Sequence, residues 1–419
     1  MKTKTQANNE TYLYRILCVL TGVVALFPVS CNYIMSGGIV TEWIARVEEL
    51  GEGLRAGQLY LFPSAEVFIR TGIKVNGMNS NFWFFFPALL YRLSGNVVFV
   101  YRIYMLVIQV VTLLGAILLF RRVFAGEETK QPCFFATLLY MTCPYRIYVC
   151  YDLANISQAT AWVLVPFYVW ALAGLMRKDE NQNLWRTWFL NIVIAALTLA
   201  GIGYADTAFF MILAGITLFI GLVLRKPWSF VPLFVGSGFF LPGLYRLIQY
   251  LFRDGYAELD MPLKTIMPNG YRFGEYFSSY SFRNGHPGMG LGMLVCLLAG
   301  AWLKFVENNG EKHKICRFFG LLSILFVFFS FYYFPWDLFQ RFGIWALKLV
   351  SLIDTPAVFW GMGFLCLCVP AACAMNRIRR HENKIMAFAI TLMVMIACIG
   401  VCVFQCNTLT YNRLPLTYP

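Results

Sequence analysis

The sequence has few charged residues and almost no histidine for its length. Of its 419 residues 13% are charged and three are histidine, whereas soluble domains are about a quarter charged. It contains no Ser-His-Asp arrangement, no phosphate-binding glycine loop and no HExxH pattern. These absences exclude a sizeable soluble domain and the best-known hydrolase, nucleotide and zinc-peptidase sites.

The thirteen cysteines also lack the patterns that bind metals. No CxxC pair occurs, and no histidine lies near Cys366, Cys368, Cys398, Cys402 or Cys406, which argues against a metal site. The cysteines lie almost wholly inside apolar runs, as Cys398, Cys402 and Cys406 do at helical spacing. We interpret them as small apolar residues that pack between helices.

Hydrophobic residues make up 59% of the chain. They form apolar runs of about 17–25 residues, each long enough to cross a bilayer core. We therefore predict an all-α fold, a polytopic transmembrane helical bundle that forms a single domain over residues 1–419. The eleven expected spans are 13–34, 96–120, 131–149, 157–176, 187–203, 206–224, 229–251, 288–306, 317–334, 357–376 and 385–406.

The basic residues indicate the orientation of the bundle. The formal net charge is +13, but the basic residues sit in short clusters between spans, for example at 121–122, 177–178 and 225–226. These clusters fall on the side of Lys2 and Lys4, which the positive-inside rule makes cytoplasmic. We predict an uncleaved first span, a cytoplasmic N-terminus and an outer C-terminus in a plasma (inner) membrane, and we exclude nucleic acid as a partner.

The first outer loop, residues 36–95, contains an amphipathic helix. Trp43, Val47, Leu50 and Leu54 recur at helical spacing, and Gly57 follows them as a helix stop. Polar residues fill the remaining faces: Glu42, Arg46, Glu48, Glu49, Glu52 and Arg55. A second interfacial helix follows at FWFFFPALLYRL, residues 82–93. We interpret this loop as the working face of the protein.

Later outer segments carry further candidates. Residues 144–158 contain Arg146 and Asp152, and the loop over 252–287 contains Arg283 and His286. Residues 335–356 predict a second surface helix. Its start overlaps FPW at 334–336, so that it carries Trp336, and Asp337 and Arg341 are spaced to form an ion pair on a helix.

Each candidate has a functional and a purely structural interpretation, and the sequence leaves both open. The acids of the first loop can act as bases, bind a metal or only solvate a surface helix. Arginines beside aromatic residues suit a lipid phosphate as well as plain anchoring at the interface. Asp206, between two spans, fits a functional acid or an exposed turn, and His286 fits a base or a turn residue.

Several short motifs in this order resemble the GT-C superfamily of membrane glycosyltransferases, nearest to its bacterial YfhO-like, PTPS-related branch. They are IARVEEL at 44–50, FPALL at 86–90, PYR at 144–146 and FPW at 334–336. The resemblance is spread over most of the chain. It implies a GT-C bundle whose working face is outside the membrane.

The resemblance also implies a reaction. In such proteins a sugar passes from a polyprenyl-phosphate donor to an acceptor, here an envelope glycan or a protein. An acid of the first outer loop serves as base or holds a divalent metal, Mn²⁺ or Mg²⁺, and basic residues hold the leaving phosphate. The matching catalytic candidates are Glu42, Glu48 and Asp152, and the substrate-binding candidates are Arg46, Arg146, Arg283, His286 and Trp336.

The chain departs from the family pattern in two places. Relatives carry an Asp and then a His before the arginine that matches Arg46, where this chain has Gly38 or Ile39 and then Trp43. A later QFPWR element reads DTPAV at 354–358. A non-catalytic relative that binds a lipid-linked glycan is therefore a second hypothesis. A lipid or polysaccharide transporter is a third, although the spans hold few ionisable groups and show no inverted repeat.

Overall fold

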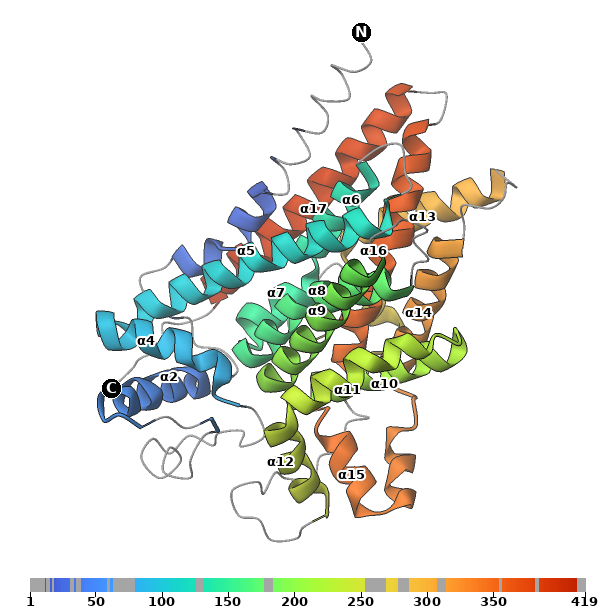
Figure 1. Ribbon diagram of the computed structural model, residues 1–419. Coiled ribbons are helices and arrows are strands. Elements are labelled where there is room, and N and C mark those ends of the chain that lie inside the picture. The colour runs from blue at the N-terminus through green and yellow to red at the C-terminus, as the bar shows by residue number, and fades with distance from the viewer. Residues whose placement is uncertain are drawn as a thin grey trace.

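The computed structural model is an elongated bundle of helices (Figure 1). It describes residues 12, 16, 19–30, 34, 39–58, 61–62, 80–125, 131–176, 184–252, 269–277, 286–306, 314–353, 356–380 and 384–412. Within these residues the extended structure is limited to one bridge, between Tyr271 and Phe331. The predicted all-α, membrane-spanning fold class is confirmed.

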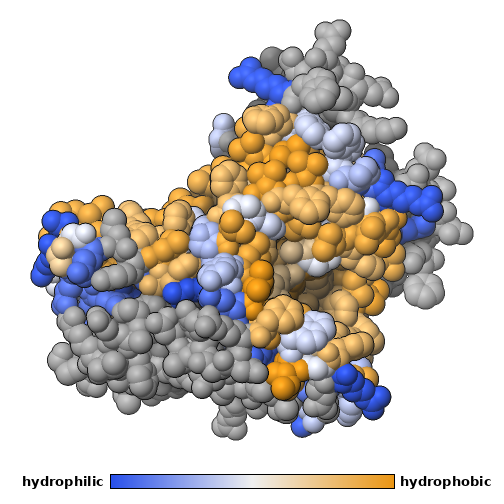
Figure 2. Space-filling model, turned by 60° about the horizontal axis from the view of Figure 1, so that its bottom comes forward, coloured by the Kyte–Doolittle hydropathy of each residue, from blue (hydrophilic) through white to orange (hydrophobic). Residues whose placement is uncertain are grey.

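In the described part of the chain, six segments are long and apolar enough to cross a membrane. They comprise α5 (Val97–Val123), the broken segment α6 (Gln131–Met141) with α7 (Pro144–Ile147) and η3 (Tyr148–Asp152), α8 (Ile156–Met176), α9 (Leu184–Ala205), α16 (Ala357–Arg380) and α17 (Lys384–Asn412). Three further apolar helices have 17 residues each: α10 (Thr207–Val223), α13 (Gly290–Val306) and α14 (Lys314–Ser330). Hydrophobic side chains form a band across the visible face, with hydrophilic ones gathered at its ends (Figure 2).

The expected span at 229–251 is broken in the structure. It consists of α11 (Phe230–Phe239) and α12 (Leu241–Phe252), and the two parts meet at 83°. Phe240, at the corner, is fully buried and packs on Tyr204 and Phe210. Pro242 follows in the first turn of α12, where a residue without an N–H is tolerated. In a continuous helix from α11 into α12 the same proline would be an interior residue and would break the helix. Hydropathy alone does not show this bend because both halves are apolar.

The first outer loop has the helix that its periodicity predicts. It is α2 (Val40–Arg55), followed by Gly57 with a φ of +72°, a backbone conformation that glycine adopts without strain. After a short turn, η2 (Phe82–Phe84), α4 (Phe85–Ser94) packs on α2. Both helices lie at the N-terminal end of α5, at one end of the bundle (Figure 1).

The late outer segment differs from the predicted surface helix. It has two parts, the 3-10 segment η9 (Trp336–Phe342) and α15 (Ile344–Ser351), separated by Gly343 with a φ of +108°. In a 3-10 helix, residues three apart and not four apart are aligned. Asp337 and Arg341 accordingly form no ion pair, and the Oδ1 atom of Asp337 is buried without a hydrogen-bond partner among the described residues. The predicted pair is wrong for this reason.

The core of the bundle is built around α16. This helix packs on α14, α13 and α6, while α8 packs on α5 and α9. Trp360 of α16 is fully buried and donates from Nε1 to the carbonyl of Pro287 at 2.9 Å. The outer segment that precedes α13 is therefore attached to the centre of the bundle.

Candidate functional site

Arg46 lies at the centre of the interface between α2 and the η2–α4 segment. Its side chain is buried, with 1% exposed. Nε and Nη2 donate to Oδ1 of Asn81 at 3.1 and 2.8 Å, and Nη1 donates to Oε1 of Glu42 at 3.4 Å. The guanidinium also lies over the ring of Phe84, 4.2 Å from its centroid. Arg46 therefore joins α2 to the segment that follows it.

Burial of Arg46 disfavours the charged form of its guanidinium. Burial lowers the pKa of its guanidinium to about 10, against the opposing effect of the carboxylates of Glu42 and Glu49. Since this value is still well above neutral pH, Arg46 is a cation under ordinary conditions. The carboxylate of Glu42 is 14% exposed and lies beside that cation, which favours its ionised form.

The polar residues of α2 divide into two groups. Glu52 and Arg55 are exposed, as expected for the solvated side of a surface helix, whereas Glu42 and Glu48 are half-buried. Arg46, which the helical spacing places outside the apolar stripe of α2, is nevertheless buried, because the η2–α4 segment covers it. The apolar spacing of α2 predicts only one buried face of this helix. The second buried face is the one that carries Arg46, whose partner Asn81 lies 35 residues further along the chain.

Asp152 lies next to the beginning of α2. Pro144 interrupts the α6 span, and the chain continues through α7 into a π-helical turn that ends at Asp152. The N–H of Ile39 donates to the carbonyl of Leu153 at 3.0 Å. This bond joins the turn after Asp152 to the residue before α2, whose first turn carries Glu42. The structure therefore brings two of the predicted acids to the same end of the bundle.

Arg146 is inside the bundle. It is 3% exposed, and it donates from Nη1 to Oε1 of Gln109 at 2.6 Å and from Nη2 to the carbonyl of Met141 at 2.8 Å. Gln109 donates onward to the hydroxyl of Tyr151, which donates to the carbonyl of Ala25. Among the described residues Arg146 has no carboxylate within 4 Å and its Nε has no hydrogen-bond partner.

A second polar cluster lies in the described part of the connection between α12 and α13, hereafter the 269–289 segment. Nδ1 of His286 lies 2.9 Å from Oε2 of Glu275, and Nε2 lies 3.0 Å from the carbonyl oxygen of Asn269. Both ring nitrogens thus face oxygen atoms of the protein. Tyr271 stacks on this ring with centroids 4.6 Å apart and donates to the carbonyl of Pro287. Burial raises the pKa of Tyr271 well above its ordinary value.

Three other sequence candidates have structural partners or lie outside the described residues. Trp336 is 6% exposed, stacks on Phe359 and donates from Nε1 to the carbonyl of Phe329 at 3.0 Å. Asp206 caps α10, since its Oδ1 accepts the N–H of Phe209 at 3.1 Å, which explains the acid between two spans. Arg283 lies outside the described residues.

The sequence analysis did not identify the partners that hold these groups. Asn81 binds Arg46, Gln109 binds Arg146, and Glu275 binds His286. A polar residue inside an apolar run, such as Gln109 in α5, is a signal that could have been used. Asn81 directly precedes η2 and Glu275 lies in the short 3-10 segment Phe273–Phe277; both are in connections between apolar helices, where polar residues are ordinary.

The described residues contain no group of three or more His, Cys, Asp or Glu side chains that could hold a metal ion. The Mn²⁺ or Mg²⁺ that the family resemblance implies therefore has no ready three-ligand site in this part of the chain.

No protein-family model and no curated protein matches the chain significantly. Among solved structures, the apo oligosaccharyltransferase of Archaeoglobus fulgidus is similar over 96% of this chain and 56% of that one (13% identity, TM-score 0.49). ArnT from Cupriavidus metallidurans, bound to undecaprenyl phosphate, is similar over 96% and 75% (12% identity, TM-score 0.49). The archaeal AglB in complex with an inhibitory peptide and a dolichol-phosphate is similar over 97% and 56% (13% identity, TM-score 0.49). The chain spans just over half the length of the archaeal enzyme.

Proposed function

We propose that this chain is a GT-C-like membrane protein that transfers a sugar from a polyprenyl-phosphate carrier to an envelope glycan or protein at the outer membrane face. The observation that carries the proposal is the hydrogen bond from Ile39 to Leu153, 3.0 Å long. It joins the residue before α2 to the residue after Asp152, so that the segments that carry Glu42 and Asp152 lie at the same end of the bundle. Proton transfer from a sugar hydroxyl requires a positioned carboxylate of this kind.

In this proposal Glu42 is the general base. Its carboxylate is partly exposed, and its ion pair with Arg46 favours the ionised form that accepts a proton. Asp152 is the second acid, with Glu48 as a further candidate on α2. Arg46 acts as a positioning residue, because its guanidinium is committed to Asn81 and Glu42.

A second candidate function is binding without transfer. The arginines proposed to hold the leaving phosphate, Arg46 and Arg146, are both buried and donate to protein acceptors. A transferase needs cations aimed at the developing phosphate charge. If no other cation supplies them, the chain would bind a lipid-linked glycan at this face and leave the chemistry to a partner enzyme.

The decisive experiment is sugar transfer by the purified protein from a panel of polyprenyl-phosphate sugars, with and without Mn²⁺ or Mg²⁺. We expect turnover that is lost in Glu42→Gln and kept in Glu52→Gln, which makes the same charge change at an exposed position of the same helix. Because Glu42 also pairs with Arg46, activity is compared per folded molecule after a thermal-stability measurement. Full activity of Glu42→Gln would remove Glu42 as the base.

Mass spectrometry of lipid bound to the same preparations separates the two candidates. A polyprenyl-linked sugar that binds without turnover supports the binding function. If neither binding nor turnover is found, uptake of lipid or polysaccharide into proteoliposomes tests the transporter hypothesis instead. The orientation in the bacterial inner membrane, with a cytoplasmic N-terminus, is part of the proposal and depends on the distribution of basic residues.

A further inference from the structure

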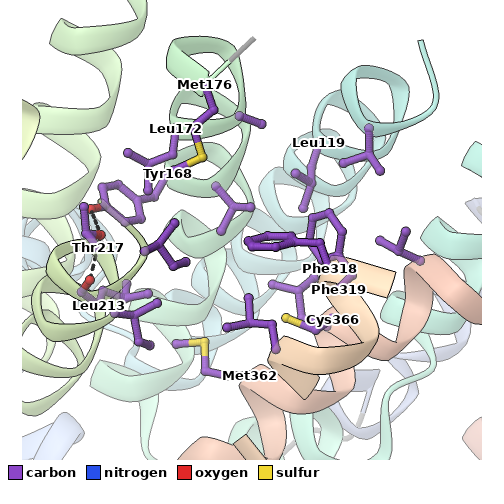
Figure 3. Close-up of a pocket in the computed structure, with 18 of the residues that line it drawn as sticks. Leu119, Tyr168, Leu172, Met176, Leu213, Thr217, Phe318, Phe319, Met362 and Cys366 are labelled. Carbon is purple, nitrogen blue, oxygen red and sulfur yellow. Dashed lines mark hydrogen bonds between the residues drawn. The ribbon is translucent and has the colours of Figure 1, made fainter. Parts of the chain in front are cut away.

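An apolar cavity lies at the opposite end of α5 from the candidate site. It has a volume of about 280 Å³ and lies between α5, α8, α10, α14 and α16 (Figure 3). On α5 it is lined by Leu119, Phe120, Arg122 and Val123, near the C-terminal end of the helix. The helix α4, which packs on α2, precedes the opposite, N-terminal end of α5. The cavity is therefore separate from Glu42 and Asp152.

The hydroxyl groups in the walls of the cavity are already hydrogen-bonded within the protein and so are not available to a sugar. The two groups, those of Tyr168 and Thr217, bond to each other at 2.6 Å, and Thr217 also donates to the carbonyl of Leu213 at 2.8 Å. Figure 3 shows this pair on one side and the rings of Phe318 and Phe319 on the other. Because the polar groups of these walls are satisfied by the protein, the occupant that fits is an apolar one.

The cavity lies where lipid can reach it. α10 packs mainly on α9, and α14 packs mainly on α16, so these two helices flank the cavity and make at most marginal contact with each other. Their outward sides carry exposed apolar residues, including Phe219 on α10 and Leu321 and Ile324 on α14. In a bilayer these residues face hydrocarbon chains, which lie beside the cavity.

Cations gather at one end of the cavity. Arg122 lines it, and its guanidinium is fixed by donation from Nη1 to the carbonyl of Trp170 (2.7 Å) and to Oδ1 of Asn191 (2.9 Å). Arg121 precedes it and is exposed, and Arg317, also exposed, directly precedes Phe318 of the wall. Basic residues at this level of a membrane attract anionic lipid head groups.

We propose that the cavity holds one acyl chain of an anionic phospholipid, with the lipid phosphate beside Arg121, Arg122 and Arg317. The occupant comes from the leaflet on the side of these arginines. The volume is close to the lower limit of about 300 Å³ for small-molecule sites, which suits part of a single unbranched chain. The site is independent of the proposed sugar transfer and lies at the other end of the same bundle.

The test uses the full chain in nanodiscs that contain phosphatidylglycerol with a photoactivatable group in its acyl chain. After illumination, the adducts are mapped by mass spectrometry. We expect adducts on the wall peptides of α10 and α14, and their loss in Leu322→Trp, which fills the cavity. The control Leu321→Trp adds the same side chain at the next residue of α14, which is 68% exposed and not part of the wall; it should keep the adducts.

Two further variants keep the test decisive. Ile216→Trp fills the cavity from α10 if Leu322→Trp does not fold, and it should also abolish the adducts. Arg317→Gln should reduce the preference for phosphatidylglycerol over phosphatidylcholine severalfold. Wall adducts that persist in both filled variants would overturn the proposal. So would competition by a polyprenyl phosphate, but not by unlabelled phosphatidylglycerol, because the cavity would then hold the carrier lipid.

Discussion

Arg46 donates two hydrogen bonds to a single oxygen, Oδ1 of Asn81, which lies 35 residues further along the chain. The bonds attach α2 to the segment that covers it, and they do so with a charged group that is 1% exposed. The position of Glu42, one helical turn before Arg46, depends on the same attachment. The orientation of the candidate base is thus coupled to a structural contact.

Replacement of Arg46 with Met should therefore destabilise the protein and weaken the attachment of α2. The substitution removes the hydrogen bonds that Arg46 donates to Oδ1 of Asn81 and to the carboxylate of Glu42, and the loss of hydrogen bonds between buried charged and polar groups costs about 1–3 kcal/mol. Arg55→Met removes the same charge from an exposed position of α2 and should change the free energy of unfolding by less than about 0.5 kcal/mol. Thermal unfolding in detergent measures both, and equal stabilities would contradict the role of Arg46.

The buried pair of Gln109 and Arg146 predicts an asymmetry between two variants. Gln109→Leu leaves a buried guanidinium without its acceptor, at a cost of about 1–3 kcal/mol or more for a charged donor. Arg146→Met removes the charge and leaves the neutral Oε1 of Gln109 without this donor, which costs less than a buried charge that has lost its acceptor. We expect Gln109→Leu to be the less stable variant in denaturant unfolding. The reverse order would mean that Arg146 has a stabilising role beyond its bond to Gln109.

Gly361 allows α16 to approach the segment that contains the π turn. A Cβ atom at this position would lie 2.5 Å from Trp162 Cζ2 and 2.5 Å from Tyr145 Cδ1. Gly361→Ala should thus cost about 1–3 kcal/mol of stability through overpacking. At Gly400 of α17 nothing lies within 4 Å of the added atom, and Gly400→Ala should be neutral or stabilising by up to about 1 kcal/mol. If both variants unfold at the same temperature, the close approach at Gly361 is incorrect.

The contact between Glu275 and His286 should hold the 269–289 segment, between α12 and α13, in place. A double-mutant cycle with Glu275→Gln and His286→Ala is expected to give a coupling energy of about 1 kcal/mol, below the value of a fully buried charged bond because both side chains are partly exposed. Either single variant should increase cleavage of this loop by protease. A coupling energy near zero would show that Tyr271 alone holds the loop.

The sequence by itself determined the class of the fold and the position of its first surface helix. Long apolar runs have few outcomes other than spanning helices, because a lipid bilayer leaves no other way to satisfy the backbone. The apolar spacing from Trp43 to Leu54 and the stop at Gly57 likewise fixed α2, since helix period and helix end are local properties.

The tertiary structure decided which polar residues are buried and which acids lie at the same end of the bundle. Arg46 and Glu52 look alike in the sequence of α2, yet one is buried and the other exposed, because Asn81 and Phe84 cover only one side of the helix. The proximity of the Glu42 turn to Asp152, the bend at Phe240 and the cavity beside Thr217 have the same origin. Each depends on packing between segments far apart in the chain, which no local periodicity encodes.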